Sequence, residues 1–232
     1  MEEVPAGTKL ALIEAAGELF AAYGFEGTSV RAIAEKAGAN VASINYHFGS
    51  KENLYTEVMR YVVYRGRSLT PSVVVEADAR LDTPEGAAEV IRELVKADFA
   101  AFYAADQPAW YGRLITRSLL DPTPPLQVVV KQIFEPDHEA LKVIFMRARP
   151  GMTADEARFW AFALTGQVIF YEFCRAPVLL HLKRERYDPA FLDAAAEHVA
   201  DSVIAALGLP RSVSHEDADT YEDAVLGAGV QK

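Results

Sequence analysis

Residues 28–54 read TSVRAIAEKAGANVASINYHFGSKENL, and this stretch decides the fold. Thr28 or Ser29 can cap a short helix, because a side-chain oxygen at that position accepts a hydrogen bond from a backbone N–H of the first turn. The apolar residues of this helix follow at helical spacing, at Val30, Ile33, Ala34 and Ala37. Gly38 then supplies a tight turn, and Asn40 can cap a second short helix. Two short helices joined by such a turn predict a helix-turn-helix.

The second helix is expected to present most of its side chains outward. Ile44 and Phe48, one turn apart, are its inward residues. Its outward residues are Val41, Ala42, Ser43, Asn45 and Tyr46. When a helix-turn-helix binds DNA, this second helix enters the major groove and its N-terminal residues contact base edges. The first outward side chains would therefore meet the bases.

Longer helices are expected on both sides of this motif. Residues 8–23 form an amphipathic pattern that Gly24 ends, with apolar positions at Leu12, Ile13, Ala16, Leu19, Phe20 and Tyr23. Ser50 can cap a helix over about residues 51–65, with Glu52 in its first turn. We therefore expect a helix-turn-helix domain over residues 1–50 and a linking helix over residues 51–66.

The motif and its flanks, from about Thr8 to Tyr61, resemble the DNA-binding domain of the TetR family of regulators. The resemblance is specific, because the capped short helix, the glycine turn, the Tyr-His-Phe ending and the Ser-Lys-Glu start occur together at the family's spacing. It implies a sequence-specific regulator that binds double-stranded operator DNA. The residues that this resemblance assigns to DNA are Thr28, Arg31, Val41, Ala42, Ser43, Asn45, Tyr46, His47 and Lys51.

These residues divide by the part of DNA that the family's positions contact. Arg31 is the candidate for a guanine, because its guanidinium can pair with O6 and N7. Val41 and Ala42 would meet thymine methyl groups. The phosphate contacts would come from Thr28, Tyr46, His47 and Lys51, helped by backbone N–H groups at the helix starts at Thr28 and Ser50.

The sequence departs from the family at the recognition helix. Position 45 is Asn where the family usually has Tyr, and Ala42 and Ser43 replace a common Lys-Gly or Pro-containing turn. The operator sequence therefore does not transfer. The alternative is a three-helix bundle without a DNA role, in which Tyr46 and His47 only fill surface or core.

The pattern of helix signals over residues 67–208 predicts a larger domain that is also all-helical. Helix starts are marked by Thr83 before Pro84, by a capping box from Thr153 to Glu156, and by Asp188 before Pro189. A proline cluster, Pro122, Pro124 and Pro125, separates two helices, and Pro136 should kink or divide the next one. No strand pattern or repeat appears, and residues 209–232 are expected to form a mobile acidic tail. The fold class is therefore all-α.

Two helices of this domain predict a homodimer. The helix near residues 155–175 is apolar on nearly every side and must be buried on two sides. Its alanine-rich partner near residues 189–207 allows close helix approach, and a four-helix interface from two subunits fits both. A dimer implies a palindromic operator. Residues 166–171 with Arg175 also resemble the C-terminal domain of a CecR-like subgroup.

The larger domain should also hold a small hydrophobic or aromatic effector. Aromatic walls with a few polar groups describe such a pocket, and the candidates are Phe99, Phe102, Tyr103, Trp110, Arg113, Arg117, Phe134, His138, Gln167 and Phe170. The alternative for each aromatic residue is ordinary core, and Arg113 and Arg117 can instead face solvent or pair with Asp121. His138, between two acidic residues, fits a solvated turn better than a ligand site. Cys174 fits a small buried hydrophobe.

Composition narrows the function classes. The net charge of −10 argues against a protein that coats nucleic acid, so DNA contact must be local, and the stretch from Thr28 to Lys51 carries a net charge of +2. No apolar run of about 20 residues and no export signal are visible. One cysteine allows no disulfide framework, and no metal or cofactor motif appears. We expect a cytoplasmic protein that uses no cofactor, metal or membrane.

Two other function classes remain open. An enzyme would need a nucleophile, and a Cys174–His138 pair is all that can be constructed, with no support from its spacing. An interaction module that has lost DNA binding would suit the acidic charge, but Arg31, Tyr46, His47 and Lys51 argue against it. We favour a ligand-responsive repressor whose dimer has two states, with the helix over residues 51–65 transmitting the change.

Overall fold

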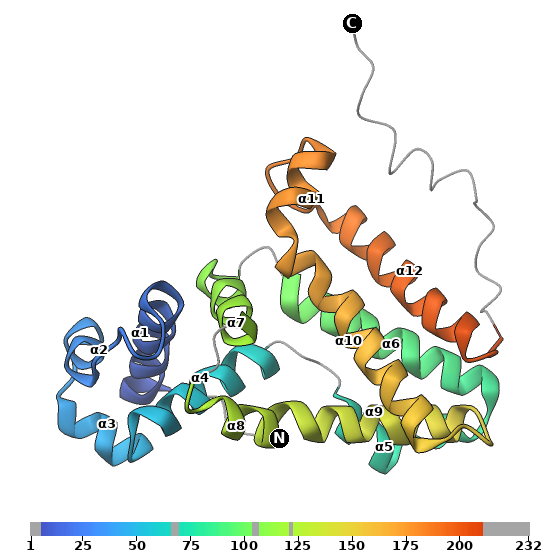
Figure 1. Ribbon diagram of the computed structural model, residues 1–232, viewed down its shortest axis with the longest axis horizontal. Coiled ribbons are helices and arrows are strands. Elements are labelled where there is room, and N and C mark those ends of the chain that lie inside the picture. The colour runs from blue at the N-terminus through green and yellow to red at the C-terminus, as the bar shows by residue number, and fades with distance from the viewer. Residues whose placement is uncertain (1–5, 66–69, 104–106, 121–122, 211–232) are drawn as a thin grey trace, which may run out of the picture. The chain divides into compact units, whose positions relative to one another are not determined.

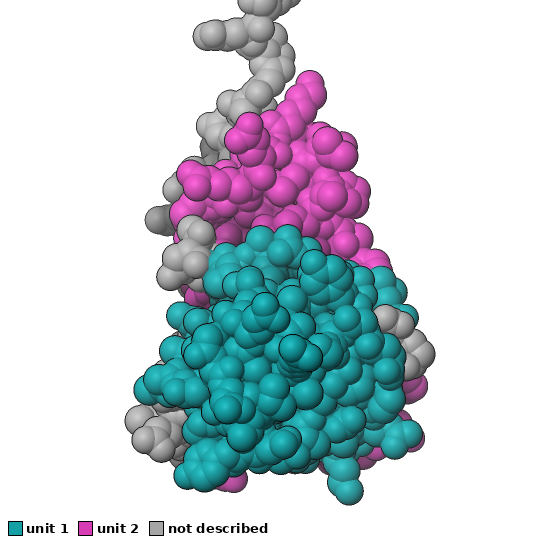
Figure 2. Space-filling model, turned by 90° about the vertical axis from the view of Figure 1, so that its left-hand side faces the viewer, with its two compact units in different colours: residues 1–66, 105–135 teal, residues 67–104, 136–232 magenta. Residues whose placement is uncertain are grey.

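The computed structural model describes residues 6–65, 70–103, 107–120 and 123–210. Within these ranges every regular element is a helix and no strand occurs (Figure 1), which confirms the predicted all-α class. The chain divides into two compact units (Figure 2). Unit 1 holds residues 1–66 and 105–135, and unit 2 holds residues 67–104 and 136–232. The predicted acidic tail lies, from residue 211 on, outside the described residues.

Unit 1 contains the predicted helix-turn-helix and more. Its elements are α1 (Gly7–Tyr23), α2 (Val30–Lys36), α3 (Val41–Phe48), α4 (Lys51–Tyr64), α7 (Trp110–Leu120), α8 (Leu126–Val129) and the π-helical turn η2 (Val130–Phe134). The sequence pattern assigns residues 105–135 to the larger domain. The structure packs them with the helix-turn-helix.

The core of unit 1 follows the predicted apolar pattern except at the end of α1. Ile13 and Phe20 are fully buried, whereas Tyr23, expected beside them, is 64% exposed. Gly24 ends α1 with φ 75°, as predicted, and Phe25 in the following turn packs on Phe20 with ring centroids 5.9 Å apart. Phe25 therefore takes the core position that Tyr23 was predicted to fill.

Helix α7 packs against α1 through two glycines. A Cβ on Gly17 would lie 2.2 Å from the Cη2 and Cζ3 atoms of the Trp110 ring, so the indole occupies that space. A Cβ on Gly24 would lie 2.7 Å from a guanidinium nitrogen of Arg117. Trp110 is buried, so it belongs to the core of unit 1.

Unit 2 is built on three long helices that run alongside one another, α6, α10 and α12 (Figure 1). Its elements are α5 (Pro71–Ala77), the 3₁₀ helix η1 (Ala79–Asp82), α6 (Pro84–Tyr103), α9 (Glu135–Ala148), α10 (Ala154–Phe173), α11 (Arg175–Leu182) and α12 (Pro189–Ala206). The predicted caps are confirmed. The Thr83, Thr153 and Asp188 side chains accept hydrogen bonds from the N–H groups of Gly86, Glu156 and Phe191.

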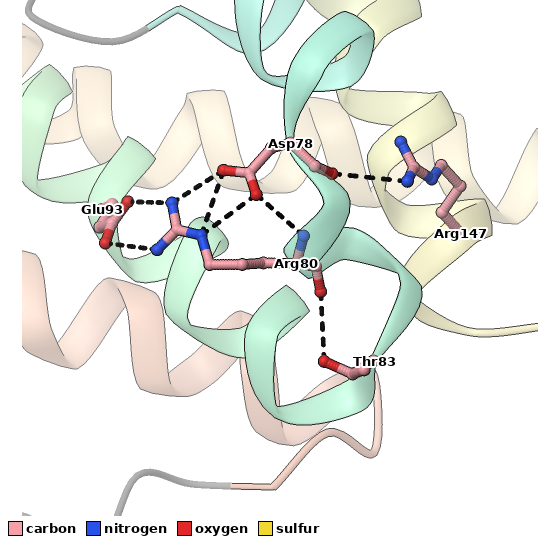
Figure 3. A network of polar contacts seen from close by, with 5 residues as sticks. All are labelled: Asp78, Arg80, Thr83, Glu93 and Arg147. Carbon is pink, nitrogen blue, oxygen red and sulfur yellow. Dashed lines mark hydrogen bonds and ion pairs between the residues drawn. The ribbon is translucent and has the colours of Figure 1, made fainter.

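Ion pairs fasten η1 to its neighbours in unit 2 (Figure 3). The Arg80 guanidinium pairs with Asp78 and with Glu93 of α6, each at 2.8 Å. Arg147 of α9 reaches the backbone carbonyl of Asp78 at 3.5 Å. It also pairs with Asp82 at 2.6 Å. The connection from α5 to α6 is therefore held from two sides.

The helix that contains Pro136 is irregular, as predicted. The N–H of Glu135 donates to the carbonyl of Val130, five residues back, so the turn before the proline is π-helical. Pro136 has no N–H and its ring would crowd a carbonyl of the preceding α-turn. The wider turn relieves that conflict.

Helix α10 has two different faces. Its inner face, at Ala157, Ala161, Leu164 and Val168, is buried in the core of unit 2. Its outer face carries large exposed apolar residues at Phe159, Phe162, Phe170 and Phe173, with Gly166 between them.

Among the described helices, none is long and apolar enough to cross a membrane.

Candidate nucleic-acid interface

The helix-turn-helix forms as predicted, and the structure decides which residue caps its first helix. The Ser29 hydroxyl accepts from the N–H of Ala32 at 3.1 Å, so Ser29 rather than Thr28 is the cap of α2. Gly38 turns the chain with φ 62°, a left-handed conformation that glycine adopts without strain. Asn40 caps α3 by accepting from the N–H of Ala42 at 2.9 Å.

The recognition helix α3 faces outward on the predicted side. Ile44 and Phe48 are buried and hold α3 to the core. The residues left on the surface are small or polar, with one large aromatic ring, and they comprise Val41, Ala42, Asn45, Tyr46 and His47, with Ser43 half-buried. A helix face of this kind can lie in a major groove without bulky obstruction at its N-terminal end.

Basic side chains border this face to different degrees. Arg31 is exposed on α2, and no ion pair in the described part of the chain involves it. Lys36 of the same helix pairs with Glu18 at 2.7 Å, which neutralises part of the predicted positive charge. Lys51 is half-buried, with its ammonium 4.2 Å from the centroid of the Phe25 ring. Arg31 is therefore the more available of these cations.

Thr28 has a different place from the one that the resemblance implies. Its side chain is 3% exposed. Its hydroxyl donates to the carbonyls of Gly24 at 2.8 Å and Leu19 at 3.1 Å, closing the α1–α2 connection. Thr28 therefore holds the helix-turn-helix in position, and its phosphate contact stays a prediction.

The start of α4 is reinforced at its first turn. The Ser50 hydroxyl accepts from the N–H of Asn53 at 3.1 Å. Hydrogen bonds to Glu52, from its own backbone N–H and from Ser50, lower the pKa of this carboxyl. The Asn53 amide donates to the carbonyl of Phe48 at 2.9 Å, which satisfies the end of α3. The junction of α3 and α4 is therefore rigidly hydrogen-bonded.

The far half of α4 is tied to the π-helical turn within unit 1. Arg60 donates to the side-chain oxygen of Gln132 at 2.8 Å, and the Tyr64 hydroxyl contacts the carbonyl of Ile133 at 3.4 Å. At the end of the helix, Arg65 donates to the Tyr111 hydroxyl at 2.6 Å. A movement of η2 or α7 would therefore displace α4 through these hydrogen bonds.

A polar cleft of about 300 Å³ lies beside the recognition helix in unit 1. Its lining comes from α1, the α3–α4 junction, α4, α8 and η2, at Lys9, His47, Phe48, Asn53, Thr56, Glu57, Val128 and Gln132. Sequence reasoning identified only His47 of this group. Lys9 and Gln132 lie far from the motif along the chain, and only the fold brings them to it.

The predicted effector-binding residues divide between the two units. Trp110, Arg113, Arg117 and Phe134 lie in unit 1, where Trp110 is core and Arg117 covers Gly24. The rest lie in unit 2, at Phe99, Phe102, Tyr103, His138, Gln167 and Phe170. Asp121, the expected alternative partner of the arginines, is outside the described residues.

His138 and Cys174 differ from their expected surroundings. The sequence pattern favours a solvated turn for His138, but this residue lies inside α9, is 9% exposed, and has its Nε2 3.1 Å from the Thr165 hydroxyl. Helix α9 turns it inward against α10. Cys174, expected to be buried, is half-buried at the junction of α10 and α11. No group of three or more His, Cys, Asp or Glu in the described part of the chain could hold a metal.

Two family models match this chain, and together they cover most of it. Residues 12–58 match the tetR family of bacterial regulatory proteins. Residues 87–207 match the C-terminal domain of the HTH-type transcriptional dual regulator CecR. The matched ranges contain the helix-turn-helix described above and most of unit 2.

Individual relatives agree with these matches. The chain is 30% identical to the HTH-type transcriptional dual regulator CecR of Shigella flexneri over 186 residues, 78% of this chain and 82% of that protein. It is 42% identical over 55 residues to the regulator RutR of Escherichia coli K12, 24% of this chain and 26% of RutR.

Solved structures show the same arrangement of helices. NalD, the secondary repressor of the MexAB-OprM multidrug efflux pump in Pseudomonas aeruginosa, superposes with a TM-score of 0.59 at 25% identity, covering 88% of this chain and 97% of NalD. The regulator PfmR of Thermus thermophilus gives a TM-score of 0.55 at 18% identity, covering 84% of this chain and 97% of PfmR.

Proposed function

Since the chain belongs to the TetR family of bacterial regulatory proteins and carries a CecR-type C-terminal domain, we propose that it is a repressor released from a palindromic operator by a small hydrophobic or aromatic molecule. At the level of the family it is a DNA-binding transcription regulator and not an enzyme. One observation carries the finer proposal. The outward face of α3 is small and polar, with Arg31 exposed beside it.

The residues of this face take different roles in the proposal. Arg31 reads a guanine, Val41 and Ala42 meet thymine methyl groups, and Ser43 and Asn45 complete the base contacts. Tyr46, His47 and Lys51 bind phosphates and set the register of the protein on DNA. Thr28, whose hydroxyl is buried, supports the motif from inside.

The test is a selection of bound fragments from a random DNA library, followed by affinity measurements at two salt concentrations. The wild type should enrich one palindromic site. Arg31→Ala should relax the preference at one base pair of each half-site, at a cost of about 1–3 kcal/mol. Lys36→Ala is the matched control, because it removes one charge from the same helix but from a side chain already paired with Glu18. A wild type that enriches no site would overturn the proposal.

The outer face of α10 supports a homodimer as part of this proposal. The exposed phenylalanines recur at helical spacing on both sides of Gly166, where an added Cβ would have no neighbouring atom within 4 Å. A second copy of α10 can approach closely at such a glycine. The alanines of α12 take part less than expected, because Ala195, Ala196 and Ala200 are buried within their own unit. We therefore centre the dimer on α10, with the exposed edge of α12 beside it.

The effector site is proposed among the candidates that lie in unit 2. Phe99 and Tyr103, whose ring centroids lie 5.3 Å apart in the core of unit 2, would form its aromatic wall, and the Gln167 side chain of α10, which accepts from the Ser202 hydroxyl at 2.9 Å, would offer a polar group. Binding there would favour one of two dimer states, with α4 carrying the change to α3. A coupling of about 1–3 kcal/mol gives a 5- to 150-fold change in operator affinity. Titration of aromatic compounds against the protein–operator complex should show such a loss.

Repression is the favoured direction of control because NalD is named as a repressor. The likeness to CecR, named as a dual regulator, favours activation at some promoters as a second function. Transcription in vitro from promoters that contain the selected site distinguishes the two.

The functional division that we propose follows the boundaries read from the sequence except at residues 105–135. Residues 1–50 bind DNA and residues 51–66 link, and the part of residues 67–208 that lies in unit 2 binds the effector and dimerises, whereas residues 105–135 support the helix-turn-helix. The protein would work in the cytoplasm, where its operator DNA lies.

A further inference from the structure

The polar cleft of unit 1 contains two basic side chains from different parts of the chain. Lys9 comes from the first turn of α1, and His47 from the end of α3. No ion pair among the described residues involves Lys9. The acidic residue of the cleft, Glu57, is paired with Arg60. The cleft is therefore locally basic on a chain whose net charge is −10.

The remaining polar groups of the cleft are largely engaged within the protein. The Asn53 amide donates to the Phe48 carbonyl, and the Thr56 hydroxyl donates to the Glu52 carbonyl at 3.0 Å. The side-chain oxygen of Gln132 accepts a hydrogen bond from Arg60, so the NH₂ group of Gln132 is left as a donor. The Lys9 ammonium and the Gln132 NH₂ group therefore remain as donors for a ligand, so the ligand should be an acceptor.

The size and polarity of the cleft limit the ligand further. Its volume of about 300 Å³ is at the lower end of ligand pockets, which span about 300–1,000 Å³. Phe48 and Val128 are its only apolar lining residues, which does not suit an aromatic effector. A small anion such as one phosphate group fits both limits.

We infer that this cleft binds one phosphate of the DNA backbone beside each half-site, held by Lys9 together with His47. The inference rests on the proposed function and adds Lys9 as a DNA contact outside the helix-turn-helix. A phosphate bound in the cleft would connect α1 to the recognition helix α3. The cleft is also lined by residues of α8 and η2. It adds affinity for DNA of any sequence and no base preference.

The test compares Lys9→Gln with the matched control Lys131→Gln, an exposed lysine on η2 outside the cleft. Each phosphate contact contributes about 0.9 to the slope of log affinity against log salt. Because the dimer loses two such contacts, the advantage of the wild type over Lys9→Gln should shrink roughly 12-fold between 50 and 200 mM salt, equally for operator and random DNA. Lys131→Gln should leave the slope near that of the wild type.

A second variant probes the same cleft without removing a lysine. Gln132→Glu keeps an acceptor for Arg60 but places a carboxylate at the cleft, so it should weaken binding to both DNAs. If Lys9→Gln and Lys131→Gln have equal salt slopes and both still prefer the operator, the inference that the cleft binds a backbone phosphate is overturned. The proposed function would still stand. Loss of operator preference in the wild type would overturn the proposed function itself.

A further arm separates the backbone from a free anion as the source of the phosphate. Inorganic phosphate replaces chloride at equal ionic strength while DNA binding is measured. The backbone source predicts that Lys9→Gln weakens DNA binding in the chloride buffer, where no free phosphate is present, and that phosphate narrows this difference by competing for the cleft. If the wild type and Lys9→Gln bind DNA equally in chloride and differ only in phosphate, the cleft is a free-anion site and the backbone source is overturned.

Discussion

Gly17→Ala should destabilise unit 1 although it improves the helix propensity of α1. Replacing a helical glycine with alanine gains about 1 kcal/mol. The new methyl group, however, would lie 2.2 Å from two atoms of the Trp110 ring and 2.9 Å from a third. Carbon atoms in contact are about 3.5–4.0 Å apart, so the buried ring must retreat by more than about 1 Å. Overpacking costs about 1–3 kcal/mol, and a rigid ring takes the upper end, which leaves a net loss of about 1–2 kcal/mol.

Thermal and urea unfolding followed by circular dichroism measure this loss, and about 1 kcal/mol lowers Tm by about 2–4 °C in a chain of this size. Trp110→Phe supplies the decisive comparison, because it removes the ring atoms that the methyl group meets. Each single variant should be destabilised, and the double variant should lose at least about 1 kcal/mol less than their sum. Additive losses, or a stabilised Gly17→Ala, would refute the argument that Trp110 requires this glycine.

Three further predictions test the dimer interface, the role of Thr28 and the ion pairs of η1. Phe170→Glu should convert the dimer to monomer in light scattering, whereas Val73→Glu, an exposed apolar position on α5, should not; a dimer that survives Phe170→Glu contradicts the α10 interface. Thr28→Val should cost about 1–2 kcal/mol of unfolding free energy, with the ratio of operator to random affinity unchanged and Thr28→Ser close to wild type; a loss confined to DNA affinity would restore Thr28 as a phosphate ligand. Hydrogen bonds from Arg80 lower the pKa of Asp78 and of Glu93, so the stability they add is present above their unfolded values of about 3.9 and 4.3 and is lost as pH falls through the lower folded values. Arg80→Gln should therefore be less stable than wild type at pH 7, by less than about 1 kcal/mol for such exposed groups, and the two curves should converge only as pH falls below the lowered folded pKa values; parallel curves would contradict this.

The helix-turn-helix could be predicted from the sequence because its signals are local. Asn40, Gly38 and the pair Ile44 and Phe48 each act within one turn of their own position, and the structure confirms all of them. The helix starts at Thr83, Thr153 and Asp188 are of the same kind. A cap or a turn needs no distant partner, so its sequence pattern is enough.

The predictions that differ from the structure concern residues whose place depends on contacts with residues far away in the sequence. The α1 pattern places Tyr23 in the core, and only packing against Phe20 and Tyr55 shows that Phe25, beyond the end of the helix, takes this position. His138 has acidic neighbours in sequence that suggest solvent, whereas α10 covers it through Thr165. Thr28 and Ser29 can each cap, and the carbonyls of Leu19 and Gly24 take the Thr28 hydroxyl.

The candidate sites show the same limit. The DNA-facing residues come from one short stretch, so their common surface could be predicted. The effector candidates came from aromatic residues on several helices, and periodicity could not show that Trp110 packs on Gly17 in unit 1 while Phe99 lies in unit 2. Lys9 gave no signal, because its relation to His47 exists only in the folded unit.

The π-helical turn before Pro136 limits how this chain can change in length. A π turn is what an α-helix becomes when one residue is inserted and the hydrogen bond spans five residues instead of four, as from Glu135 to Val130. A deletion within residues 130–134 would restore a regular helix, but the proline would then face the carbonyl that the wider turn now spares it, at a cost of about 3 kcal/mol. The inserted residue and the proline therefore depend on each other. Among homologues, loss of the residue should be accompanied by replacement of the proline.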